Sequence, residues 1–193
     1  MPLAPRELVL AACFAALACL GSLLLRFGSA ALVPFSLLPF VAVLAGGLLG
    51  PRIGAISMGL YTLIGLFGVP VFHRPPFGGP AYLLQPTFGF IPGFILAAWL
   101  TGWLLAHRHG ELRYQVATVL GVVAPYIVGL PYFYFIMNFY LGQAVTPWRV
   151  MELCFFPFIL FDLIKALLAG RVIALTVRRV KWLPGVVKPA RKG

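Results

Sequence analysis

Residues 87–106 read TFGFIPGFILAAWLTGWLLA, twenty residues without one charged side chain. A helix needs roughly 20 apolar residues to cross the hydrocarbon core of a bilayer, which is about 30 Å thick. This stretch is therefore long enough and apolar enough to be a transmembrane helix. The 193-residue chain as a whole has the same character, with 62% hydrophobic residues, 10% charged residues and a mean hydropathy of +1.00. Soluble domains carry about 25% charged residues, so the composition predicts an integral membrane protein.

Further apolar runs flank this stretch and are separated by Gly, Pro and charged residues. Together they predict an all-α bundle of six transmembrane helices forming one membrane domain over residues 1–193. The expected spans are about 7–25, 35–49, 53–67, 87–106, 114–141 and 149–177, followed by a basic cytoplasmic tail, 178–193. The Pro- and Gly-rich segment 68–86 predicts a long outer loop between the third and fourth helices. Its many apolar residues favour a folded lid.

Lysine and arginine are distributed unevenly over the predicted loops. With both termini in the cytoplasm, the inner side holds ten of these cations and the outer loops hold three, Arg26, Arg74 and Arg149. Because cytoplasmic flanks of membrane proteins are enriched in Lys and Arg, we expect a multi-pass protein of the cytoplasmic membrane with both termini inside. Contact with lipid headgroups then accounts for the net charge of +11, and no nucleic-acid partner is predicted.

Two charged residues, Asp162 and Lys165, lie within the predicted sixth span. Charges at membrane depth are costly, are usually paired and commonly mark functional sites. The spacing of three residues puts both on one helix face. Such a pair suits a cyclic urea, since the acid accepts an N–H and the amine donates to the carbonyl. A ligand carboxylate attracted to the lysine and a purely structural ion pair are the alternatives. Pro157 should kink the helix beside the pair.

Other motifs limit the possible functions. None of the four lysines is followed by Ser or Thr, which excludes a nucleotide-binding P-loop, so any energy for active transport must come from another chain. His107 and His109 lie in a polar loop without a nearby thiol pair, which predicts a solvated loop and no metal site. In the first span the small residues recur at the spacing that lets membrane helices approach closely: Ala11, Ala12, Ala15 and Ala16.

Five motifs then follow one another in the order and spacing of a known family. They are Gly50-Pro51-Arg52-x-Gly54-x-x-Ser57-x-x-x-Tyr61, Gly68-x-Pro70-Val71-Phe72, Gly78-Gly79, Pro86-Thr87-x-Gly89-Phe90-x-x-Gly93-Phe94 and Pro157-Phe158-x-x-x-Asp162-x-x-Lys165. The set extends from about Val33 to Lys165. It resembles the BioY family, the biotin-specific S components of energy-coupling factor (ECF) transporters.

The resemblance implies a compact bundle of six helices with a biotin site near the outer face, under the loop before the fourth span. It implies that Asp162 and Lys165 contact the ligand, and further candidate contacts are Phe72, Tyr82, Gln85 and Thr87. It also implies docking, through the Ala-x-x-x-Ala face of the first span, onto a transmembrane T component with two cytoplasmic ATPases. These partners would use ATP, whereas this chain would need no cofactor and perform no bond chemistry.

Three departures from the family's pattern leave the fine specificity open. They are Ser36-Leu37-Leu38 where the family often has Thr-Leu-Gln, Gln85 where it has Gly, and Phe90 where it has Tyr. An S component for a different vitamin is therefore one alternative. A small membrane-embedded enzyme that uses Asp162 and Lys165 as acid and base is another, although no nucleophile, metal cluster or second carboxylate accompanies the pair. A membrane scaffold, with the ion pair purely structural, is the third.

Overall fold

The computed structural model describes residues 3–27, 36–107 and 112–180, and within these ranges every regular element is helical. The elements are α1 (Pro5–Phe27), α2 (Leu38–Leu49), α3 (Pro51–Leu66), η2 (Pro80–Leu84), η3 (Pro86–Gly89), α4 (Phe90–His107), α5 (Arg113–Phe135), η4 (Ile136–Tyr140), α6 (Pro147–Cys154) and α7 (Phe156–Arg179). The predicted start of the second span at 35, most of the loop at 107–113 and the basic tail beyond 180 lie outside the described residues.

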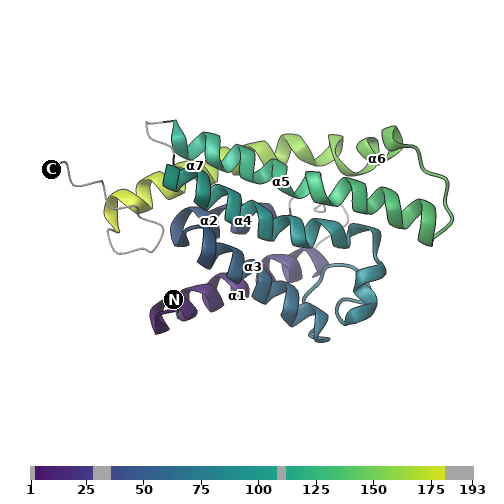
Figure 1. The fold of residues 1–193 in the computed structure, drawn as a ribbon, viewed down its shortest axis with the longest axis horizontal. Coiled ribbons are helices and arrows are strands. Elements are labelled where there is room, and N and C mark those ends of the chain that lie inside the picture. Colours follow the sequence, from purple (N-terminus) through teal and green to yellow (C-terminus); the bar gives the residue numbers. More distant parts are fainter. Residues whose placement is uncertain (1–2, 28–35, 108–111, 181–193) are drawn as a thin grey trace.

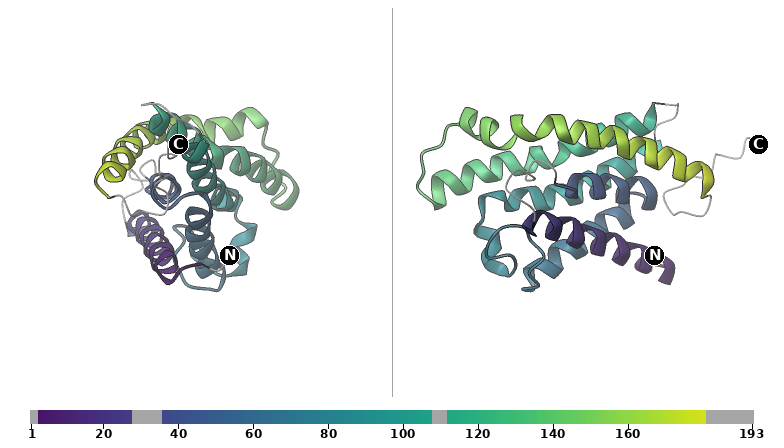
Figure 2. Two further views of the ribbon diagram at one scale, coloured as in Figure 1. Left: turned by 60° about the vertical axis from the view of Figure 1, so that its left-hand side comes forward. Right: turned by 180° about the vertical axis from the view of Figure 1, so that it is seen from behind.

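The long helices run side by side and form one bundle (Figure 1). The short α2 lies near its centre and contacts α1, α3, α4, α5 and α7 (Figure 2, left). Its central place follows from its composition, since Leu38–Leu49 contains no polar side chain and most of its residues are buried. Around it, α4 packs against both α3 and α5.

Helices α2 and α3 are shorter than the bilayer is thick. They contain 12 and 16 residues, so they span about 18 and 24 Å at 1.5 Å per residue. Gly50 separates them because it takes a φ of 85°, which glycine adopts at no steric cost. Among the described residues three stretches are long and apolar enough to cross a membrane alone: Pro5–Leu24, Pro86–His107 and Arg113–Tyr140. Six full-length spans, as predicted from sequence, are therefore not reproduced, because two of the predicted spans form the short helices α2 and α3.

The predicted sixth span is a bent pair. Helices α6 and α7 meet at Phe155 with an angle of 47°, and together they qualify as a fourth membrane-crossing unit. Pro157 lies at the start of α7, where its missing N–H breaks no helical hydrogen bond. The expected break near the ion pair is present, but it lies at Phe155, and Pro157 is accommodated in the first turn of α7, five residues before Asp162.

The segment between α3 and α4 folds onto the bundle through aromatic packing. The Phe72 ring lies 4.2 Å from the Tyr82 ring and 5.6 Å from the Tyr61 ring on α3, measured between centroids. Gly65 makes this approach possible, because a Cβ there would lie 2.1 Å from the Phe72 ring. The segment lies at the bundle end opposite to the start of α1 and the end of α7 (Figures 1 and 2, right).

Candidate functional site

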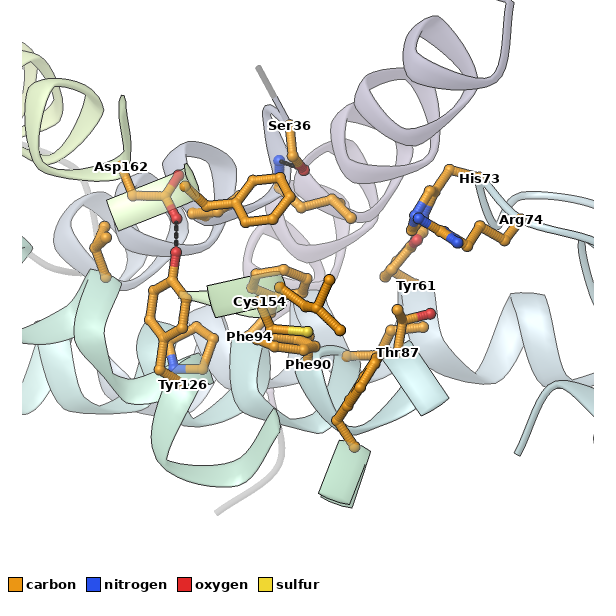
Figure 3. A pocket seen from close by; sticks show the side chains of 18 of the residues that line it. Ser36, Tyr61, His73, Arg74, Thr87, Phe90, Phe94, Tyr126, Cys154 and Asp162 are labelled. Carbon is orange, nitrogen blue, oxygen red and sulfur yellow. Dashed lines mark hydrogen bonds between the residues drawn. The ribbon is translucent and has the colours of Figure 1, made fainter. Parts of the chain in front are cut away.

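A cavity of about 500 Å³ lies inside the bundle, within the range of about 300–1,000 Å³ typical of small-molecule sites. Residues from the helices α1 to α7 and from the segment between α3 and α4 contribute to its lining. The middle of the cavity is apolar, and its wall includes Phe90, Ile91, Phe94, Val122, Phe133 and Phe158. Polar side chains are found toward its two ends (Figure 3).

At one end, Asp162 is held by one side chain from α7 and one from α5. The Lys165 ammonium lies 2.5 Å from Asp162 Oδ1, and the Tyr126 hydroxyl on α5 donates to Asp162 Oδ2 at 2.5 Å (Figure 3). Lys165 Nζ also donates to the Ser36 carbonyl at 2.7 Å. Asp162 is only 4% exposed, so its charge is compensated at both oxygens, as a buried carboxylate requires.

This arrangement makes the Asp162 end of the cavity rich in hydrogen-bond acceptors. A carboxylate oxygen has two lone pairs, so each Asp162 oxygen retains one for a ligand N–H. The Tyr126 oxygen, whose proton is donated to Asp162, is an acceptor as well. Lys165 is absent from the cavity lining, and it positions and neutralises the carboxylate from behind.

The opposite end of the cavity is basic. His73 and Arg74 reach it from the segment before η2 (Figure 3). Arg26 reaches it from the last turn of α1. The Arg26 guanidinium lies 3.8 Å above the Phe77 ring and donates to the Pro70 carbonyl at 3.3 Å. Burial and the neighbouring Arg74 charge lower the pKa of His73 to about 4, so the imidazole is neutral at pH 7. Thr87 Oγ1, also in the lining, is buried and makes no hydrogen bond of ordinary geometry to the described residues.

Comparison with known proteins identifies the chain. The model of the BioY family matches residues 1–182. The chain belongs to the BioY family. A protein of Lysinibacillus sphaericus named probable biotin transporter BioY is 37% identical over 172 residues, which cover 86% of each chain. The biotin transporter BioY of Thermotoga maritima is 33% identical over 177 residues, covering 91% of this chain and 98% of that one.

A solved structure shares the fold. The crystal structure of the S-component for biotin from an ECF-type ABC transporter superposes with a TM-score of 0.69, covering 92% of this chain and 95% of that one. The two sequences are 24% identical, so the likeness concerns the arrangement of the helices. This agrees with the all-helical architecture expected from the sequence.

The structure separates the candidate ligand contacts into two groups. Asp162 and Thr87 line the cavity, and Lys165 lies directly behind Asp162. Phe72 and Tyr82 do not line it, because both are fully buried in the aromatic packing that attaches the loop to α3. Gln85 is also outside the lining and joins η2 to η3, where its carbonyl accepts from the Phe88 N–H. These three residues thus shape the loop above the cavity.

Two features of the site escaped the sequence analysis. Tyr126 is 36 residues from its partner Asp162, and no spacing rule connects two residues that far apart on different helices. The basic end was missed because Arg26 and Arg74 were considered only as outer-loop charges. The one available signal was that the polar pair His73-Arg74 occurs in a loop otherwise rich in Pro, Gly and apolar residues.

The four alanines of α1 point in two directions. Ala11 and Ala15 are 0% and 2% exposed and pack into the core of this chain against residues of α2 and α3. The expectation that they face a partner is therefore wrong for this conformation, since α1 uses them to approach its own bundle. Ala12 and Ala16 are exposed and remain available for contact with another chain.

Proposed function

We propose that this chain captures biotin with high affinity at the outer face of the cytoplasmic membrane and is the substrate-binding subunit of an ECF-type transporter. The observation that carries the proposal is the largely apolar cavity with the Asp162–Tyr126 acceptor pair at one end. The names of the BioY relatives supply the substrate. They disfavour both a different vitamin and a membrane-embedded enzyme built on Asp162 and Lys165.

In the proposed pose, the ureido ring of biotin lies at the Asp162 end. Its N–H groups donate to Asp162 and Tyr126, whose oxygens have free lone pairs. The aromatic rings of Phe90, Phe94 and Phe158 cover the apolar part of the bicyclic ring. Lys165 and the Ser36 carbonyl hold the carboxylate in place, so little ordering is left to occur when the ligand binds.

The transport cycle that we propose uses partner subunits for energy. Biotin enters from outside, the loop over the cavity closes, and a transmembrane T component with cytoplasmic ATPases drives reorientation of the bundle. The exposed small side chains Ala12 and Ala16 on α1 offer a flat surface for docking to that T component. Both termini are cytoplasmic in this arrangement, in keeping with the surplus of Lys and Arg on the inner side.

Equilibrium binding of labelled biotin to the detergent-purified chain tests the proposal. We expect saturable binding by the wild type and loss of most affinity in Asp162→Asn, because the amide replaces an acceptor that faces a ligand N–H. Arg149→Ala is the matched control, since Arg149 pairs with Glu152 on α6 and is absent from the cavity lining. A folded wild-type chain that binds no biotin would refute the proposed function.

A further inference from the structure

The cavity has opposite polarity at its two ends. The Asp162 end offers acceptors, and its single negative charge is neutralised by Lys165 at 2.5 Å. The other end contributes Arg26 and Arg74, so the two arginines leave the described part of the site with a net positive charge. No other acidic residue of the described chain lines the cavity. An elongated ligand with a neutral donor group at one terminus and an anion at the other matches this polarity.

From this geometry we infer that Arg74, together with Arg26 and His73, forms a binding site for the carboxylate at the far end of the ligand's aliphatic chain. The inference rests on the proposed function, because it takes biotin as the ligand and the Asp162 end as the place of its ureido ring. The biotin carboxylate would then bind to residues outside the Asp162–Lys165 pair. The basic end of the cavity would make the protein prefer biotin, the free acid, over its neutral derivatives.

Contacts within the basic end hold its groups in position before the ligand binds. Arg26 is fixed by stacking on Phe77 and by donating to the Pro70 carbonyl, so α1 is tied to the loop that carries Arg74. His73 adds a neutral N–H donor beside the two guanidinium groups. Arg74 makes no ion pair with any described residue, so its donors are available to an anion. Guanidinium groups and carboxylates match in geometry, since both are planar and form paired hydrogen bonds.

A lipid phosphate is the competing anion for an exposed arginine at this end of the bundle. Arg74 is exposed, which is compatible with lipid contact. However, Arg74 lines the same cavity as Arg26 and His73, and these residues come from both α1 and the loop. Because separate elements bring these three side chains to one cavity, the ligand carboxylate is favoured over a lipid phosphate.

Competition binding with biotin and biotinamide, which share the ring system and differ in charge, tests the inference on the purified full chain. We expect the wild type to bind biotin at least tenfold more tightly than biotinamide. In Arg74→Ala the affinity for biotin should fall about tenfold while that for biotinamide stays within about twofold, so the preference disappears. Arg74→Lys should keep much of the preference, and Arg149→Ala should keep all of it.

The outcomes separate this inference from the proposed function. Asp162→Asn should weaken binding of both ligands equally and preserve their ratio. If the wild type binds biotin and biotinamide equally, or if Arg74→Ala weakens both alike, the carboxylate site is refuted while the proposed function stands. If the wild type binds neither ligand, the proposed function itself fails and the carboxylate site fails with it. Should Arg74→Ala not fold, Arg74→Gln gives the same comparison with the side-chain length retained.

Discussion

The hydroxyl of Tyr126 on α5 and Oδ2 of Asp162 on α7 are joined by a hydrogen bond of 2.5 Å across 36 residues of sequence. On the other side of the same carboxylate, the Lys165 ammonium contacts Oδ1. Tyr126 therefore connects two helices and, at the same time, presents an oxygen to the cavity that both residues line. Its role combines positioning of Asp162 with a direct contribution of one acceptor to the ligand.

Replacing Tyr126 by Phe should weaken biotin binding about tenfold, because one acceptor is lost and Asp162 loses a charge-assisted donor. The measurement is equilibrium binding to the purified chain, with melting temperature as the check of folding. Tyr114→Phe is the control, since Tyr114 is on the same helix but outside the cavity lining. Unchanged or tighter binding in Tyr126→Phe would show that Asp162 alone accepts the ligand.

Replacing Lys165 by Met should destabilise the fold by about 3–5 kcal/mol, because it leaves the Asp162 carboxylate buried without its cation. The double variant Asp162→Asn/Lys165→Met should recover most of this stability and yet bind no biotin. Thermal unfolding in detergent and binding are measured on the same samples. If the double variant binds biotin normally, the ion pair is purely structural.

Substituting Gly46 by Ala should destabilise the bundle by about 1–3 kcal/mol, because the new Cβ would lie 2.0 Å from the Ala98 carbonyl oxygen on α4. Gly59→Ala is the matched control on α3, where a Cβ meets nothing within 4 Å. The control should be neutral or slightly stabilising, since Ala favours helices. Equal melting temperatures for the two variants would contradict the close α2–α4 packing.

Lowering the pH from 7 to 5 should reduce stability through His73. Its pKa is about 4 in the folded protein, below the ordinary value of about 6.5, because of burial and the charge of Arg74. Below pH 6.5 His73 therefore binds a proton in the unfolded chain but stays neutral in the folded chain. The contribution of His73 to the free energy of unfolding is fully present above pH 6.5 and is lost as the pH falls toward 4.

Melting temperatures of the wild type and His73→Asn across pH 5–7 measure this effect. The wild type should lose more stability than the variant over that interval, because asparagine has no proton to gain. Parallel curves for the two proteins would mean that His73 titrates normally in the folded state.

Local sequence patterns predicted correctly those features that depend on one helix alone. The break in the last span lies at Phe155, close to Pro157, which occupies the first turn of α7, and the pairing of Asp162 with Lys165 follows from the geometry of one helix turn. The same kind of signal failed for Ala11 and Ala15. The spacing of small residues indicates that another helix can approach α1 closely, but it does not specify whether that helix belongs to this chain or to a partner.

The sequence by itself determined that the chain is an all-helical membrane protein of the BioY family, because apolar composition, helix-length runs and ordered motifs are properties of the chain in one dimension. Only the tertiary structure decided that α2 is a short central helix, that Tyr126 supports Asp162, and that Arg26 and Arg74 face the far end of the same cavity. The physical reason is that a site is formed by side chains from different helices, whose relative rotation and depth depend on packing across the whole bundle.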